Sequence, residues 1–139
     1  MTLRLAGRLR GCIGVVVAQI PLALTVVRCA AAAACEDPRF PPVSLQEAED
    51  LELEISLLDP PRPVSDPAEI EVGRHGLVIT DGNHRGLLLP QVAVEQGWDR
   101  ITFLREVCRK ASLDPDAWRR GAHLELFGAQ IIPAEGPKI

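Results

Sequence analysis

The amino-acid sequence predicts an α+β fold in which short helices accompany an antiparallel sheet. Residues 51–57 alternate apolar and polar side chains, which is typical of a strand with one buried face. Two pairs of short strand patterns are joined by glycine-containing turns, as in β-hairpins. Hairpins mixed with short helical patterns favour an antiparallel sheet over repeated βαβ units.

Six strands are expected. The first hairpin turns at Ala6-Gly7 and the second at Asp81-Gly82-Asn83. The proline-rich segment 59–67 is expected to be a connection, because proline cannot donate a hydrogen bond to a sheet. The expected strands cover residues 2–5, 8–13, 51–57, 76–80, 85–89 and 124–132.

Four helices are expected from their start and stop signals. Pro21 fits a first helical position, Ser44 and Glu47 form a capping-box pattern, and Asp99 is an N-cap. Gly97 ends the helix before it. The first helix is apolar on nearly every side and is therefore expected to be buried. The expected helices cover residues 21–36, 45–50, 90–96 and 99–111, with Ile101 and Cys108 on the apolar face of the last one.

Length and charge favour a single globular domain over residues 1–139 and argue against nucleic acid as a partner. The chain has 15 basic and 19 acidic residues, which gives a net charge of −4. Phosphate binding needs clustered positive charge. Residues 1–35 carry four arginines and no acid, so the remaining 11 basic and 19 acidic residues give the rest of the chain −8.

The apolar run from Cys12 to Val27 imitates a secretory signal, and the sequence around Cys35 imitates a lipoprotein cleavage box. Glycine and proline interrupt the run, and Arg28 stands where a charge is unfavourable. The run is also too short and too interrupted to cross a bilayer. We therefore expect a reduced cytoplasmic protein without a membrane partner, with an exported lipoprotein as a minor alternative.

The segment Leu9-Arg10-Gly11-Cys12-Ile13-Gly14 carries the most pointed chemistry. If residues 8–13 form a regular strand, Arg8, Arg10 and Cys12 share one face, and Leu9 and Ile13 face a core. A guanidinium beside the thiol would favour the reactive thiolate. Gly11 and Gly14 would let a ligand or another backbone approach closely. The alternative is that Cys12 is a small structural residue and that the arginines face water.

Five segments in order make the chain recognisable. It resembles the AMMECR family, whose prokaryotic members are called AmmeMemoRadiSam system protein A. The resemblance covers nearly the whole chain from Thr2 onward. Family members usually begin with a further helix and strand, so we expect either a miscalled start or a shortened member. The shared segments are LRGCIG (9–14), EDPRFPP (36–42), LEIS (53–56), GRHGL (73–77) and GLLLPQVA (86–93).

The resemblance implies two unequal lobes with a cleft between them, and LRGCIG near that cleft. We expect the smaller lobe within about residues 37–75. Bacterial members often accompany a Memo-like protein and a radical SAM protein, so these two are expected partners. The family carries no established reaction, and neither cofactor nor substrate follows, beyond an expected small molecule or peptide.

Other polar residues are candidate companions of Cys12. Arg39 lies in a proline-stiffened loop and could bind an anionic group, or the loop could simply end a helix. Glu54 and Ser56 share the polar face of a strand, which could line a cleft or face water. Arg74 and His75 lie between glycines; His75 could serve Cys12 as a proton carrier, or be a hydrogen-bonded turn residue.

Three functions remain open from the sequence. The first is an enzyme or enzyme component that uses Cys12, His75 and Glu54 as catalytic residues and binds its ligand through Arg10, Gly11, Gly14, Arg39, Ser56 and Arg74. The second is a non-catalytic module that binds the expected partner proteins. The third is the exported lipoprotein. No metal site is expected, because the cysteines and histidines lack the close spacing of metal ligands.

Overall fold

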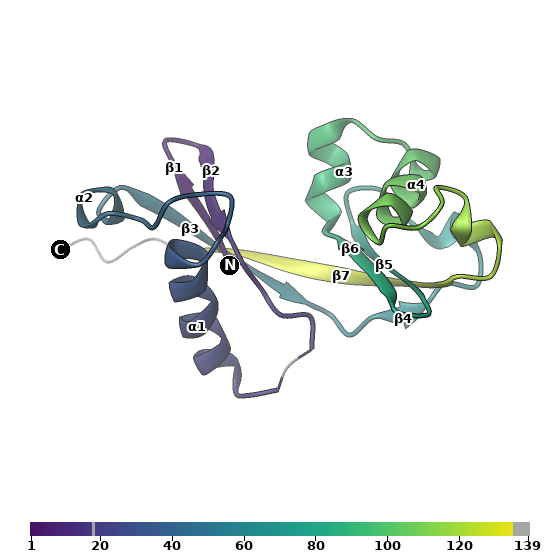
Figure 1. The fold of residues 1–139 in the computed structure, drawn as a ribbon, viewed down its shortest axis with the longest axis horizontal. Coiled ribbons are helices and arrows are strands. Elements are labelled where there is room, and N and C mark those ends of the chain that lie inside the picture. Colours follow the sequence, from purple (N-terminus) through teal and green to yellow (C-terminus); the bar gives the residue numbers. More distant parts are fainter. Residues whose placement is uncertain (18, 135–139) are drawn as a thin grey trace. The chain divides into compact units, whose positions relative to one another are not determined.

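A computed structural model describes residues 1–17 and 19–134 of the chain (Figure 1). Its strands are β1 (Thr2–Leu5), β2 (Arg8–Cys12), β3 (Leu51–Leu58), β4 (Arg62–Pro63), β5 (His75–Asp81), β6 (His84–Leu88) and β7 (His123–Ala134). Its helices are α1 (Leu22–Cys35), α2 (Leu45–Ala48), α3 (Pro90–Gln96) and α4 (Arg100–Lys110), with short 3-10 turns at Pro67–Glu69 and Ala117–Arg119. The expected strands and helices are thus present.

The strands form an antiparallel sheet in the order β2-β1-β3-β7-β5-β6, which confirms the α+β fold. The chain divides into two compact units. The first unit comprises Met1–Leu57 and Ile131–Ile139, and the second comprises Leu58–Gln130. Within the second unit, Arg62 and Pro63 pair with Leu126 and Glu125 as strand β4, so the expectation of a purely connecting segment there is wrong.

In the first unit, β1 lies between β2 and β3, and α1 packs on one face of β1 and β2. Leu3, in the centre of the three strands, is only 2% exposed. It pairs with Gly11 on one side and with Leu53 on the other. A Cβ atom at Gly11 would collide with the carbonyl oxygen of Ala33 in α1. The glycine therefore lets helix and strand backbones touch.

A β-bulge changes the expected faces of β2. Arg4 pairs with Leu9 and Leu3 pairs with Gly11, so Arg10 is an extra residue between two paired ones. Arg8 pairs with Leu5 and therefore lies on the face opposite Cys12. The prediction that Leu9 faces a core is also wrong, because its side chain is 38% exposed.

Helix α1 differs from expectation in its burial. Only Cys29 and Ala33 are buried within it. Leu22, Leu24 and Val27 are 58%, 53% and 66% exposed. The helix therefore packs on β1 and β2 through its C-terminal half, and its apolar first turns are uncovered within the described part of the chain.

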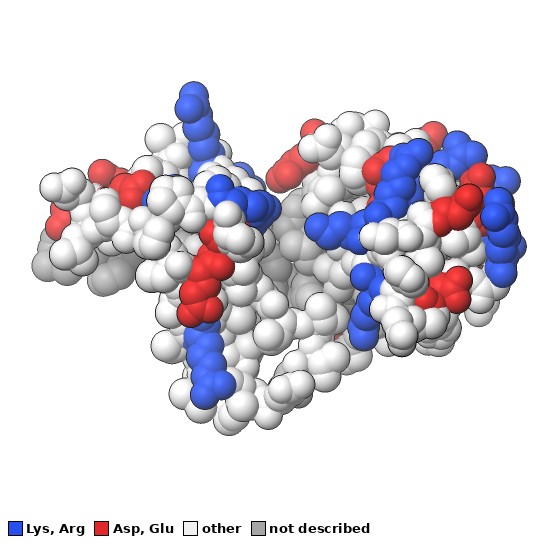
Figure 2. Space-filling model, viewed as in Figure 1, with Lys and Arg blue, Asp and Glu red and all other residues white. Residues whose placement is uncertain are grey.

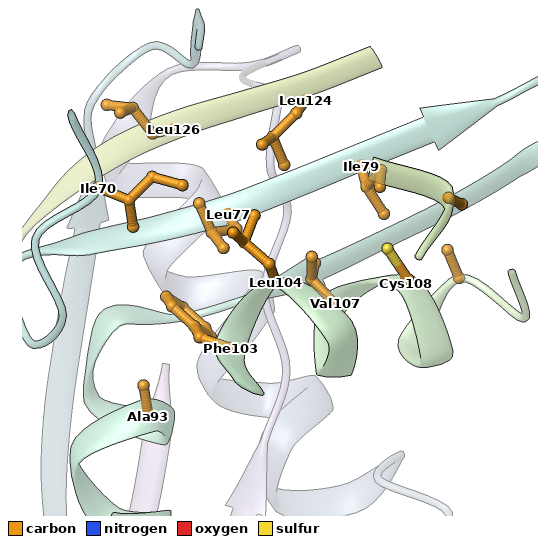
Figure 3. Close-up of a cluster of buried hydrophobic side chains, with 12 residues drawn as sticks. Ile70, Leu77, Ile79, Ala93, Phe103, Leu104, Val107, Cys108, Leu124 and Leu126 are labelled. Atoms are coloured by element: carbon orange, nitrogen blue, oxygen red, sulfur yellow. The ribbon is translucent and has the colours of Figure 1, made fainter. Parts of the chain in front are cut away.

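The second unit holds the main hydrophobic core, between β5 and α4 (Figure 3). Phe103, Leu104 and Val107 of α4 are fully buried and point toward β5, where Leu77 and Ile79 are equally buried. The core residues recur at helical spacing, as expected for an amphipathic helix. The buried cluster comprises Ile70, Leu77, Ile79, Ala93, Phe103, Leu104, Val107, Cys108, Ala111, Ala117, Leu124 and Leu126.

Local signals position α4 as predicted. The Asp99 side chain accepts a hydrogen bond from the Thr102 main-chain N–H at 2.7 Å and so caps the helix. Gly97 ends α3 with φ of 67°, a left-handed backbone that favours glycine. Cys108 is buried as expected, whereas Ile101 lies at the edge of the apolar face and is 36% exposed.

The apolar run at Cys12–Val27 does not form one helix, because β2 ends at Cys12 and α1 begins only at Leu22. No helix in the described residues is long and apolar enough to span a membrane.

On the face drawn in Figure 2, acidic and basic side chains are interspersed over the second unit.

Candidate functional site

A row of side chains crosses three strands of the first unit. Thr2 on β1 pairs with Cys12 on β2 and with Glu54 on β3. Directly opposed residues share a sheet face, and Gly11, next to Cys12, faces α1. Cys12, Thr2 and Glu54 therefore lie on the face opposite α1. The Thr2 hydroxyl is 3.4 Å from Cys12 Sγ, within hydrogen-bond distance of sulfur.

Cys12 is a free cysteine and is partly buried as a residue. The other cysteines are free as well. Cys29 and Cys108 are buried, and Cys35 is exposed. Among the cysteines of the described residues, Cys12 is the one whose thiol lies within hydrogen-bond distance of a side-chain hydroxyl.

Asp37 and Arg39 fasten the segment after α1 to the main chain of Cys12. The buried Asp37 carboxylate accepts the Cys12 main-chain N–H at 2.9 Å. It also accepts Arg39 Nε at 2.9 Å and Nη2 at 2.7 Å. Arg39 Nη2 reaches the Cys12 carbonyl oxygen at 3.4 Å. One carboxylate and one guanidinium thus fix both main-chain polar groups of the cysteine.

Asp37 and Arg39 are both ionised at neutral pH. The hydrogen bonds from Arg39 and then the N–H of Cys12 hold the pKa of Asp37 well below its usual range. Hydrogen bonding to Asp37 is the main cause that raises the pKa of Arg39. The Arg39 side chain is 54% exposed, and its guanidinium carbon is 5.5 Å from the Phe40 ring centroid. Arg39 is therefore held through Nε and Nη2, and about half of its side chain is open to solvent.

Arg10 is engaged elsewhere. Its Nε and Nη2 donate to the Glu47 carboxylate at 2.9 and 3.1 Å. Its Nη1 and Nη2 donate to the carbonyl oxygens of Pro41 and Pro42 at 2.8 and 3.3 Å. Its side chain is only 12% exposed. Arg10 therefore holds the proline loop against β2, and the guanidinium that bonds to Cys12 in the described residues is that of Arg39.

This attachment predicts a stability change in acid. The Arg10 hydrogen bonds, and next the Ser44 main-chain N–H, lower the pKa of Glu47 from 4.5 to about 2. Because the folded-state pKa is depressed, the stabilisation is present above pH 4.5 and is lost as the pH falls toward 2. We expect Glu47→Gln to be less stable at pH 7 and to lose less stability between pH 4.5 and 2, as measured by urea unfolding at each pH.

Glu49→Gln is the matched control, because it removes an acidic residue just beyond the same short helix without touching Arg10. It should keep the acid dependence of the wild-type protein. An identical acid profile for Glu47→Gln and the wild type would show that the Arg10–Glu47 pair contributes nothing measurable.

The two glycines of the segment have different surroundings. Gly11 is buried and touches the α1 backbone, so its small size serves packing between two backbones. Gly14 is exposed, and a Cβ there would meet no atom within 4 Å. Among the described residues, the space beside Gly14 is therefore open, whereas the α1 backbone occupies the space beside Gly11.

Glu54 and Ser56 are partly buried, so this face of β3 is not simply a solvated surface. Two residues apart, they lie on the same face of the strand. The Ser56 hydroxyl is buried and has no recorded hydrogen-bond partner among the described residues. A buried hydroxyl without a partner is unfavourable by about 1–3 kcal/mol, so it is a group that a water or ligand would stabilise.

Arg74 and His75 lie in the second unit, whereas Cys12 lies in the first. His75 Nδ1 accepts a hydrogen bond from the Glu71 main-chain N–H at 3.0 Å. Arg74 Nη1 pairs with the Glu71 carboxylate at 3.2 Å. Both residues therefore stabilise the turn before β5.

Sequence reasoning missed Thr2 and Asp37. Thr2 is found only when the register of β1 and β2 is known, and the bulge at Arg10 hides that register. Asp37 lies in the shared segment 36–42, in which Arg39 is the predicted site residue. An aspartate directly after an apolar helix and before a proline was the available signal. In the part of the chain that the structure describes, no three His, Cys, Asp or Glu side chains gather as a metal site.

The sequence matches the AMMECR1 family over residues 1–132. The chain belongs to this family. AMMECR1-type relatives include a protein of Thermococcus gammatolerans and protein PF1979 of Pyrococcus furiosus, each 46% identical over 136 residues. These alignments cover 94% of the chain but only 66% and 65% of the two relatives. The chain thus spans about two thirds of their length.

The AMMECR1 fold is also shared with a solved structure. The crystal structure of uncharacterized protein PH0010 from Pyrococcus horikoshii superposes with a TM-score of 0.90 at 42% sequence identity. The match covers 99% of this chain and 73% of PH0010.

Proposed function

We propose that this AMMECR1-domain protein is an enzyme, or the enzyme component of an assembly, whose reacting group is the thiol of Cys12. The observation that carries the proposal is the setting of that thiol. The residue is partly buried, its sulfur lies within hydrogen-bond distance of a hydroxyl, and two charged side chains hold its main chain. A cysteine placed only for packing needs none of these contacts.

The residues around Cys12 divide the work of such a site. Asp37 and Arg39 hold the cysteine backbone rigidly, which positioned nucleophiles require. Glu54 is a carboxylate in the same row and would accept or return a proton. The solvent-exposed part of the Arg39 guanidinium would bind a carboxylate or phosphate group of a substrate. The unpaired Ser56 hydroxyl would add a hydrogen bond to the same ligand.

The proposal also covers the partners, the compartment and the substrate class of the protein. Memo-like and radical SAM proteins are the partners we propose, in the cytoplasm, with a small molecule or peptide as substrate. His75 and Arg74, which lie in the second unit, stay candidate residues of the proposal.

A second function is favoured by a different observation. Six of the nine exposed large apolar residues described in the first unit lie within residues 15–27. Such surfaces are typical of protein interactions. They favour a non-catalytic module that binds partner proteins and positions them. The residues are Val15, Val16, Val17, Leu22, Leu24 and Val27.

The thiol proposal is tested by alkylation. Iodoacetamide is applied from pH 5 to pH 10, and each cysteine is followed by peptide mass spectrometry. We expect Cys12 to react with a midpoint below that of an ordinary thiol, about 8.5, because only a stabilised thiolate is useful as a nucleophile at neutral pH. The exposed Cys35 of the same molecule is the internal reference. A Cys12 midpoint at or above 8.5 would refute the reactive thiolate.

The two functions are separated by Cys12→Ser and by Val27→Asp. If the protein is an enzyme component, the serine variant abolishes the activity of the assembly while its partners still co-purify. If it is only a module, the serine variant behaves as wild type, and the aspartate variant loses the partners.

A further inference from the structure

Thr2 is the described residue whose side chain lies within hydrogen-bond distance of the Cys12 sulfur. The main-chain N–H of Cys12 is occupied by Asp37, and its carbonyl oxygen by Arg39. Those contacts fix the backbone and leave the side chain unbound. The Thr2 hydroxyl is the recorded hydrogen-bond partner of Cys12 Sγ among the described residues.

The contact follows from the strand register. Met1 and Ile13 exchange hydrogen bonds in both directions, at 3.1 Å each. The next pair, Thr2 and Cys12, is therefore a non-hydrogen-bonded pair of the antiparallel ladder, in which opposed side chains approach most closely. Threonine is also stiff at χ1, so the hydroxyl has few other directions.

Burial strengthens the contact. Thr2 is only 6% exposed, so water has little access to its hydroxyl. A buried hydroxyl needs a partner, and a charged acceptor is a better one than a neutral acceptor. The Thr2 hydroxyl can accept from the neutral thiol or donate to a charged sulfur, so it offers a partner to the sulfur in both states.

The charged groups on the elements around Cys12 include Asp37 and Arg39 after α1, Arg4 on β1, and Glu52 and Glu54 on β3. The Arg10–Glu47 pair and the Met1 ammonium, which donates to the Ile13 carbonyl oxygen, also lie near the end of β2. Asp37 and Arg39 form a pair without net charge. Arg4 opposes Glu52 in the neighbouring row, with unlike charges. Glu54, two strands from Cys12, disfavours the thiolate. Arg39 attracts a negative charge on Cys12, and the Thr2 hydroxyl is the neighbouring group that lies within hydrogen-bond distance of the sulfur itself.

We propose that Thr2 is a positioning residue that orients the Cys12 sulfur and stabilises its thiolate by donating its hydroxyl hydrogen. The inference deepens the proposed function and rests on it for its biological meaning. The chemical step is the deprotonation of the Cys12 thiol. The S–H bond breaks, the proton goes to a solvent base, and the electron pair stays on sulfur. The Thr2 O–H remains intact and turns its hydrogen toward the sulfur.

The test compares Thr2→Val, which has the same shape without a hydroxyl, with Thr2→Ser, which keeps the hydroxyl. The probe is iodoacetamide, and the readout is the pH midpoint of Cys12 alkylation. We expect Thr2→Val to raise the midpoint by about one pH unit, which is about a tenfold slower reaction at pH 7. Thr2→Ser should restore most of the wild-type midpoint. A role in strand packing alone would make valine the better replacement.

Thr80→Val on β5 is the matched control, because it makes the same change in a strand of the second unit. It should leave the Cys12 midpoint unchanged, and circular dichroism checks that each variant is folded. An unshifted midpoint in Thr2→Val, or no rescue by serine, overturns the role of Thr2. A wild-type midpoint of 8.5 or more that still rises in Thr2→Val would instead reject the proposed enzyme and retain the hydrogen bond.

Discussion

Gly11→Ala should be the most damaging single change in the first unit. The added Cβ would overlap the carbonyl oxygen of Ala33, and both partners are backbone, so neither can turn away as a side chain would. We expect a loss of about 3 kcal/mol or more in the free energy of unfolding, at the upper end of overpacking effects. Urea unfolding followed by far-UV circular dichroism measures it, because both tryptophans lie in the second unit.

Gly14→Ala is the control from the same six-residue segment. Its Cβ meets no atom within 4 Å, so the stability should be unchanged or rise by less than about 1 kcal/mol. Equal effects of the two substitutions would mean that α1 and β2 are not in backbone contact in solution. Buried Cys29 gives a second readout, since its alkylation should become faster in Gly11→Ala as α1 loosens.

Phe103→Ala should have the largest effect in the second unit. The ring is fully buried between α4 and β5, and its removal leaves a cavity in the main core. Phe→Ala substitutions at such sites lose about 3–5 kcal/mol. Tryptophan fluorescence is the suitable measurement, because Trp98 and Trp118 pack against this core. The alkylation midpoint of Cys12 should stay the same in the folded variant, since Cys12 belongs to the first unit.

Ile101→Ala on the same helix is the comparison. Its side chain is 36% exposed, so it should lose far less stability than Phe103→Ala. A small effect of Phe103→Ala, close to that of Ile101→Ala, would contradict the assignment of the core.

Local signals explain which elements could be predicted. The helix after Asp99 and the stop at Gly97 depend on one residue and its immediate neighbours, so the sequence is sufficient. The capping box of Ser44 and Glu47 is present for the same reason. Burial of Cys108 followed from its helical spacing with Leu104 and Val107.

The contacts around Cys12 depend on pairing between segments and could not be predicted in this way. The extra residue at Arg10 shifts the alternation of β2, so a guanidinium expected beside the thiol holds Glu47 instead. Asp37 is separated from Cys12 by 25 residues, and spacing alone does not reveal their hydrogen bond. The sequence did identify Arg39, although not its carboxylate partner.

Helix α1 illustrates a different limit. Its apolar composition correctly predicts a helix that needs cover, but composition does not say whether the described chain provides it. The exposed Leu22 and Val27 show that β1 and β2 shield only the other end.

The bonds that Asp37 and Arg39 make to Cys12 have a consequence for assembly. Among the described strands β2 is the outermost one, and a strand in that position normally offers its amides and carbonyls to another extended peptide. At Cys12 both groups are already satisfied by side chains of the same molecule. A second chain cannot extend the sheet there, so the neighbourhood of the thiol is protected against intermolecular strand addition and the aggregation that follows from it.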